Sequence, residues 1–388
     1  GAGGEAAAGA LRRAEGLVLV LDDGAAALRD PGCAALAVAC LRQGRKLDLV
    51  SSSGVVLADG LTTPELAEEA DKYVGAGLRS KADREKLFPL DVLRAGLAAE
   101  LEGAGEEGRR SFRALFAAGG WRAAVDAGAA ELLPQLSEAL AADASRECLL
   151  VCLAFCGRAT SDVAEAVGKA VAPSVGSWFV DLSCCEKLGD DGVRAIAGRL
   201  PGALRSLTLL CWRCERLTNV SVAAVADALP AQLELLELNF TGCRKVTAAA
   251  IEHLVSKLPA STRTLRLLFP YAQISDAGLL AVAAQLPLGL RELSLDFAEC
   301  QGIGDPGVQG LARALPAGLE RLRFSARGCA GISDKSVVAL ARGLPSGLTA
   351  LTVQLKETGV SPEKVKMCSD LQAMREHAAS SKSCCALQ

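Results

Sequence analysis

The stretch LELLELNFTGCRKVTAAAIEHLVSKLPAS, from Leu233 to Ser261, is the clearest copy of a unit that recurs through the second half of this chain. In its first part the apolar residues Leu236, Leu238 and Phe240 alternate with polar ones. A period of two is typical of a short strand with one buried face. The stretch therefore predicts a strand at the start of each unit.

The second part of the unit has a different period. Ala250, Ile251, Leu254 and Leu258 recur at helical spacing, which predicts a helix with one apolar stripe. Pro259 ends the unit, because proline cannot continue a helix.

The same unit recurs in register seven times, with a length of 28–29 residues. The other copies begin at Val175, Leu204, Thr262, Leu290, Leu319 and Leu348. The position three residues after the last strand residue holds Cys185, Cys214, Cys243, Ala272, Cys300 and Cys329. One strand and one helix cannot bury their apolar faces alone, so neighbouring units must stack. We expect an α/β solenoid with parallel strands inside and helices outside.

This pattern resembles the leucine-rich repeat family, in particular its cysteine-containing class. The resemblance rests on L-x-F-x-x-C-x-x-V-T from Leu238 to Thr247, and on ISDAG and ISDKS, which begin at Ile274 and Ile332. The units are longer than is usual in that class and nearer the ribonuclease-inhibitor-like length. The resemblance implies a horseshoe with a protein-binding concave surface and no catalysis.

The first half of the chain has a different organisation. Residues 1–15 are rich in glycine and alanine and are expected to be disordered. Residues 16–173 are predicted to be all-helical, and their best unit, Trp121 to Arg158, resembles an armadillo repeat with its Asp126–Ala129 entry to a helix. An irregular helical domain or an extended cap is the alternative. Residues 174–360 hold the leucine-rich repeats, 361–378 a capping helix and 379–388 a flexible tail.

Composition narrows the possible functions. The 388 residues have a formal net charge of −3 and only 4% aromatic residues, which argues against a nucleic-acid partner. No apolar run is long enough for a transmembrane helix. The fifteen cysteines and the lack of a signal peptide favour a reducing, cytoplasmic location.

The cysteines raise the question of metal or redox chemistry. Cys211 and Cys214 form a C-x-x-C, but both occupy core positions of the repeat. Cys148, Cys152 and Cys156 have the spacing of one buried helix face, with no fourth ligand nearby. We therefore expect no metal site.

Signals of catalysis are also scarce. The two histidines, His253 and His377, lie on predicted helices without a nucleophile in phase, and no phosphate-binding loop or hydrolase motif is present. We expect no enzyme activity, no cofactor and no small-molecule substrate.

The last four residues, Cys385 to Gln388, match the C-a-a-X prenylation signal, and a terminal glutamine favours farnesyl. Cys384 could carry a palmitoyl chain. One prenyl chain alone holds a protein to a membrane only marginally. The motif predicts a peripheral membrane tether, with chance similarity as the alternative.

The concave strand face is the expected binding site, because exposed aromatic residues and arginines dominate interface energetics. Alternation places a set of large or charged residues there: Trp212, Asn239, Arg266, Tyr271, Asp296, Glu299, Arg323 and Arg327. It also places Asp181, Leu210 and Ser325 on this face. Partial packing against a neighbouring strand is the alternative for each aromatic residue.

The sequence thus predicts a non-enzymatic scaffold that binds a protein partner on this face. Two alternatives stay open: the substrate-recognition subunit of a ubiquitin ligase, and a regulator of a small GTPase. No F-box, RING segment or catalytic arginine can be recognised in support of either.

Overall fold

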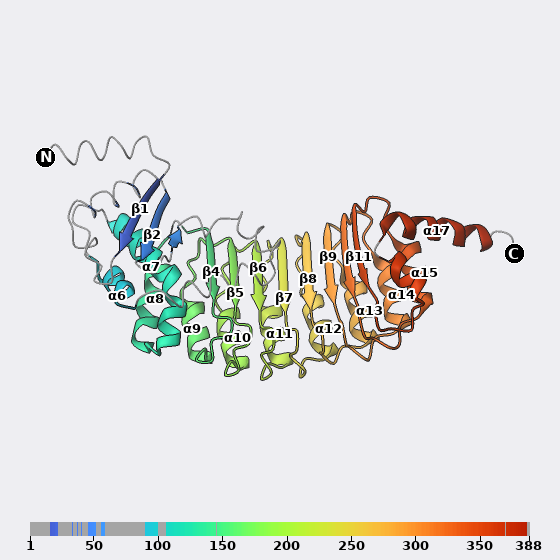
Figure 1. The fold of residues 1–388 in the computed structure, drawn as a ribbon, viewed down its shortest axis with the longest axis horizontal. Helices are drawn as coiled ribbons and strands as arrows, with labels where there is room; N and C mark the ends of the chain where they lie inside the picture. The colour runs from blue at the N-terminus through green and yellow to red at the C-terminus, as the bar shows by residue number, and fades with distance from the viewer. Residues whose placement is uncertain are drawn as a thin grey trace. The chain divides into compact units, whose positions relative to one another are not determined.

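The computed structural model describes residues 16–21, 33, 37, 40, 46–51, 56–58, 90–99, 106–144, 146–368 and 370–385. The chain divides into two compact units, Gly1–Cys185 and Glu186–Gln388. Figure 1 shows the strands of the second unit side by side in chain order, with the helices forming a second layer on one side of them.

Eight parallel strands follow one another through the sheet in chain order, as predicted for an α/β solenoid. They are β4 (Cys148–Cys152), β5 (Ser177–Asp181), β6 (Ser206–Leu210), β7 (Leu235–Asn239), β8 (Thr264–Leu268), β9 (Glu292–Asp296), β10 (Arg321–Ser325) and β11 (Ala350–Gln354). From β5 onward, each strand begins two residues after the predicted start of its repeat. The predicted repeat array is therefore confirmed.

One helix follows each strand from β4 to β10. These helices are α9 (Ser161–Lys169), α10 (Asp190–Ala197), α11 (Asn219–Asp227), α12 (Ala248–Ser256), α13 (Asp276–Gln285), α14 (Asp305–Ala314) and α15 (Asp334–Gly343). Their buried residues form the predicted apolar stripe, as Ile251 and Leu254 do in α12. The core of each repeat lies between this stripe and the inward side of its strand.

The repeated cysteine is a core residue. Cys243, Cys300 and Cys329 have no exposed surface. Each thiol donates a hydrogen bond to a carbonyl of the preceding repeat, as from Cys243 Sγ to the oxygen of Cys211 (3.3 Å) and from Cys300 Sγ to that of Phe269 (3.4 Å). Burial raises the pKa of the Cys243 and Cys300 thiols to about 12, so neither is a reactive thiolate.

A second set of links joins the starts of successive helices. The Asp305 carboxylate accepts hydrogen bonds from the Ser333 N–H (2.8 Å), the Ser333 hydroxyl (2.5 Å) and the Ser336 hydroxyl (2.5 Å) of the next repeat. Asp190 does the same for Thr218 and Ser221. These bonds satisfy N–H groups that a helix start leaves without a partner. We call this set the helix-start ladder; it explains the aspartate of the ISD motif.

The all-helical prediction for residues 16–173 is wrong in two places. The first unit contains a small sheet of β1 (Gly16–Leu21), β2 (Lys46–Ser51) and β3 (Val56–Ala58). Cys148, Cys152 and Cys156 do not share a helix, because residues 148–152 form β4. Leu149-x-Val151-x-Leu153-x-x-Cys156 is in fact the strand pattern of the later repeats, one repeat earlier than predicted.

The elements described between Leu90 and Ala141 are helical, as predicted. They are α6 (Leu90–Ala98), α7 (Glu106–Ala127), the short 3-10 helix η2 (Ala130–Leu132) and α8 (Leu133–Ala141). The predicted helix entry at Asp126–Ala129 lies where α7 ends, and Gly128 adopts a φ of 73° that glycine tolerates at a helix end. The predicted disordered segment 1–15 lies outside the described residues.

The C-terminal region also differs from the prediction. Two helices replace the single capping helix, α16 (Pro362–Met367) and α17 (Leu371–Cys385), because the Asp370 carboxylate accepts the N–H groups of Gln372 (2.8 Å) and Ala373 (3.1 Å) and starts a new helix. The helix α17 extends into the predicted flexible tail as far as Cys385. Residues 386–388 lie outside the described part.

Candidate protein-binding surface

The sheet of the second unit has helices on one side, and the opposite side is the candidate surface. We call this side of β6 to β11 the strand face. The first and third residues of each strand point toward it, while the fourth is a core residue and so, in most strands, is the second, as Leu236 and Leu238 are in β7. The parallel register holds equivalent positions side by side, so each position forms a row across the strands.

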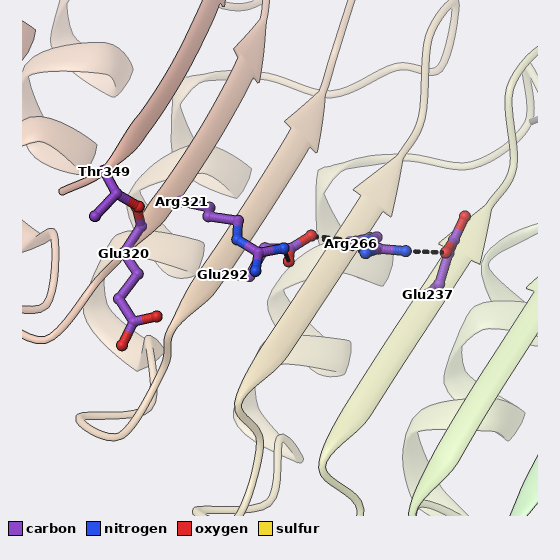
Figure 2. A network of polar contacts seen from close by, with 6 residues as sticks. All are labelled: Glu237, Arg266, Glu292, Glu320, Arg321 and Thr349. Carbon is purple, nitrogen blue, oxygen red and sulfur yellow. Dashed lines mark hydrogen bonds and ion pairs between the residues drawn. The ribbon is translucent and has the colours of Figure 1, made fainter. Parts of the chain in front are cut away.

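A chain of ion pairs crosses the strand face from β7 to β10 (Figure 2). Arg266 Nη1 lies 3.1 Å from Glu237 Oε2, and Arg266 Nη2 lies 2.8 Å from Glu292 Oε1. Arg321 Nη1 lies 3.4 Å from the other oxygen of Glu292. The side chains of Arg266, Glu237 and Glu292 are only 15%, 13% and 19% exposed, whereas Arg321 is 65% exposed.

These contacts change the interpretation of Arg266. Its Nε also donates to Glu292 Oε1 (2.9 Å), so both edges of its guanidinium group are engaged within the sheet. A guanidinium held by two carboxylates is already paired before any partner arrives. Arg266 therefore acts first as a link between three strands.

A second row lies just beyond the strands, where one residue of every repeat adopts a left-handed backbone. In the second unit these residues are Arg213, Gly242, Tyr271, Glu299, Gly328 and Glu357, with φ between 56° and 78°. Their N–H groups bond the next repeat, as from Tyr271 to the Ala298 oxygen (2.9 Å) and from Glu299 to the Arg327 oxygen (2.7 Å). A non-glycine residue there costs about 1 kcal/mol, so four of these six repeats tolerate some strain.

This strain fixes the direction of large side chains. Tyr271 is 44% exposed, and burial does not explain its presence. Trp212, one residue before the left-handed position, is only half-buried. At Gly328 an added Cβ would lie 2.6 Å from the carboxylate of Glu299, so that flexible side chain would have to move.

Two predicted contact residues shape the loops that follow their strands. Asn239 Oδ1 accepts the N–H of Thr241 (3.0 Å), and Asp296 Oδ1 accepts the N–H of Ala298 (3.1 Å). Such bonds from a side chain to the backbone two residues ahead are Asx turns. Both side chains are half-buried, so their main contacts are with the loop.

Two arginines lie at the β10 end of the strand face. Arg323 is exposed, and within the described residues it forms no ion pair. Arg327 lies 3.5 Å from both Glu299 and Glu357 and is 41% exposed. Arg323 is therefore the more available cation.

Alternation alone misplaced three residues of the predicted face. Asp181, Leu210 and Ser325 are 4%, 7% and 3% exposed. Each is the fifth and last residue of its strand. Burial raises the pKa of Asp181, although its Oδ1 accepts the N–H of Ser183 (2.9 Å).

The sequence analysis missed a buried polar cluster in the first unit. Arg122, on α7, donates from Nε to Asp126 Oδ2 (2.8 Å) and from Nη1 to the Ala154 oxygen, and it is 7% exposed. The Cys156 thiol donates to Asp126 Oδ1 (3.0 Å), and burial raises its pKa to about 11. The cluster joins α7 to the end of the β4 repeat. A charged pair four residues apart in the otherwise apolar second half of α7, residues 114–127, was the available signal.

The described part of the chain contains no group of three or more histidine, cysteine or acidic residues placed to hold a metal. None of its helices is long and apolar enough to cross a membrane. Cys211 and Cys214 are fully buried. His253 Nε2 lies 2.8 Å from Asp227 Oδ1 on an exposed helix surface, away from the strand face.

The family model described as Leucine Rich repeat matches residues 179–197 and 293–312. No curated protein sequence matches the chain. Among solved structures, the yeast Rad7 and Elc1 complex has 16% identity and a TM-score of 0.37, covering 76% of this chain and 72% of that chain. The leucine-rich repeat-containing protein LegL7 from Legionella pneumophila has 14% identity and a TM-score of 0.38, covering 70% and 86%. Similarity this low says nothing about function.

Proposed function

We propose that this leucine-rich repeat protein is a non-enzymatic scaffold that binds a protein partner on its strand face. The observation that carries the proposal is Tyr271, which is 44% exposed on a backbone held in the left-handed region. An exposed aromatic residue at a strained position contributes little to folding. Its rigid backbone limits the entropy lost when a partner contacts it.

The charges of the same surface support a polar interface around this aromatic residue. Arg323 is exposed on the same strand face, two strands from Tyr271, and Arg266 on β8 is already paired with Glu237 and Glu292. Interfaces of this kind place aromatic and arginine anchors at the centre and charged residues at the rim. The predicted contact residues Trp212, Asn239, Asp296, Glu299 and Arg327 complete the proposed site.

The test begins with affinity capture and mass spectrometry to identify a partner, followed by calorimetric titration of purified proteins. Tyr271→Ala is expected to weaken the affinity by about 2 kcal/mol, and Trp212→Ala by a similar amount. Thermal unfolding of each variant shows whether the repeats stay folded, which matters most for the half-buried Trp212. Glu252→Ala, on the exposed side of α12, is the control. Equal affinities for wild type, Tyr271→Ala and Trp212→Ala would refute the proposal.

The two alternative functions remain separate proposals. A pull-down for ubiquitin ligase core subunits tests the first. Turnover of small GTPases with and without the chain tests the second. A clear signal in either assay would assign a regulatory role to the scaffold.

The membrane tether is also a proposal, and it requires Gln388 to be the last residue of the natural protein. Its support is the C-a-a-X pattern that begins at Cys385, next to Cys384. Cys385→Ser should move the protein from the membrane fraction to the soluble fraction. Unchanged fractionation, together with an unmodified C-terminal peptide by mass spectrometry, would exclude the tether.

A further inference from the structure

The helix side of the second unit carries an open groove of about 740 Å³, away from the strand face. It runs along α15 and is bordered by α14 and by Lys364 of α16. The charged residues that line it are Arg313, Asp334, Lys335, Arg342 and Lys364. Four of these are cationic and one is acidic, which gives a formal charge of +3.

The cations gather at the two ends of the groove. Arg313 and Arg342 occupy the last turns of α14 and α15. Lys335 lies in the first turn of α15, where Lys364 pairs with Asp334 (3.1 Å). Lys335 and Arg342 are seven residues apart on one helix, a separation of about 10 Å along its axis.

The middle of the groove is small and apolar. Val338 and Ala339 of α15, with Ala312 of α14, lie between the two charged ends. This charge pattern is not a general property of the repeats. The positions equivalent to Arg313 are Ala284 in α13 and Ser256 in α12. The positions equivalent to Lys335 in the same two helices are Ala277 and Ala249.

The geometry points to an acidic peptide segment as the occupant of this groove. Carboxylates three residues apart in an extended chain are about 10 Å apart, which matches the distance between the charged ends. An apolar side chain between them would fit over Val338 and Ala339. A single phosphate group is too short to reach both ends. The helix groove is thus a second binding site, independent of the strand face.

The probe is a fluorescein-labelled peptide of sequence Glu-Glu-Leu-Leu-Glu-Glu, compared with Gln-Gln-Leu-Leu-Gln-Gln, in fluorescence anisotropy with the full chain. The acidic peptide should bind and the glutamine peptide should bind at least tenfold more weakly. Raising the salt from 50 to 500 mM should weaken the acidic peptide further, because exposed charges are screened.

The decisive variant is Arg313→Gln combined with Lys335→Gln, which removes one exposed cation from each end. We expect about a tenfold loss of peptide affinity. The control is Arg244→Gln combined with Lys245→Gln, two exposed cations in the loop before α12. Tyr271→Ala should leave peptide binding unchanged, so the result is independent of the strand-face proposal.

Three outcomes would overturn the inference: no binding of the acidic peptide, equal binding of the glutamine peptide, or equal losses in the groove and control variants. Flotation with phosphatidylcholine vesicles containing phosphatidylserine separates a lipid surface from a peptide. Vesicle binding that is lost in the groove variant, without peptide binding, would assign the groove to a membrane instead.

Discussion

Two junctions between neighbouring repeats of the second unit show how differently the same packing can be secured. Between the β9 and β10 repeats, Asp305 accepts three hydrogen bonds from Ser333 and Ser336, and the Cys329 thiol donates to the Phe297 oxygen (3.3 Å). Between the β7 and β8 repeats, both link positions hold alanine. Ala248 replaces the aspartate and Ala272 replaces the cysteine.

The β7–β8 junction has other contacts in their place. The half-buried ion pair of Glu237 and Arg266 crosses it on the strand face. The rings of Phe240 and Phe269 stack across it, with centroids 5.4 Å apart and planes at 4°. At this junction the carboxylate link is on the strand face alone, whereas the β9–β10 junction has one at the helix start as well as the Glu292–Arg321 pair on the strand face. The helix-start link can therefore be absent from a junction that stays packed.

The variant with the largest expected effect is Arg266→Met, which tests whether the ion pairs of Arg266 stabilise the β7–β8 junction. It leaves Glu237 and Glu292, which are 13% and 19% exposed, without their shared cation. We expect a loss of about 3 kcal/mol, because a partly buried charge is left unpaired. Urea unfolding with amide hydrogen exchange at the β7–β8 junction measures it. The exposed Arg321→Met should cost less than about 1 kcal/mol. Similar losses for both variants would show that Arg266 is not a special link.

The second variant is Asp305→Ala at the β9–β10 junction, which removes three accepted hydrogen bonds at the start of α15. The Ser336 side chain has no exposed surface and would lose this acceptor. A cost of about 2 kcal/mol is expected, near the upper end for a helix cap. Asp191→Ala is the control, because its carboxylate is 82% exposed and pairs only with Arg194 in its own helix. Differential scanning calorimetry should separate the two by several degrees.

A third variant adds the helix-start carboxylate that the β7–β8 junction lacks. Ala248→Asp places a carboxylate where Asp276 sits one repeat later; Asp276 accepts the N–H groups of Gly304 (2.8 Å) and Gly307 (3.0 Å). Gly278, the equivalent of Gly307, leaves room for it. A gain of about 1 kcal/mol is expected. Ala249→Asp, one residue farther along the exposed side of α12, should give little gain. A loss of stability in Ala248→Asp would mean that this junction cannot adopt the ladder geometry.

The smallest expected effect is on pH dependence. Burial would raise the pKa of Asp305, but the hydrogen bonds donated by Ser333 and Ser336 outweigh it and hold the pKa below its ordinary value. A depressed folded pKa gives stability that is complete above the ordinary aspartate value and is lost as the pH falls through the folded value. Wild type should therefore lose more stability than Asp305→Ala below pH 4. Parallel melting curves from pH 7 to pH 2.5 would contradict this.

Much of the fold could be predicted from the local sequence pattern, but much less of the candidate binding surface could. Leu236 and Leu238 are buried as their alternation predicted, and the Cys243 position is a core position as its register predicted. Tyr271 was correctly expected to be exposed. The role of Arg266 could not be predicted, since its partners lie 29 and 26 residues away and become neighbours only when the repeats stack.

The β4 repeat shows the limit of pattern reasoning. Cysteines four residues apart at Cys148, Cys152 and Cys156 fit a helix face as well as a strand followed by a turn. The sheet decides between them, because β4 can pair with the edge of β5 in the same register as the later strands. A short apolar segment can fit either pattern, and it becomes a strand where a neighbouring strand supplies hydrogen-bond partners for its backbone.

The sequence by itself determined the period of the repeats, the strand and helix within each, and the residues of the core, because these depend on spacings of two to four residues. Only the tertiary structure decided which polar side chains are engaged within the sheet, which lie open to a partner, and where cations from α14, α15 and α16 meet in one groove. Those properties depend on contacts between residues about 29 apart, and stacking alone brings such residues together.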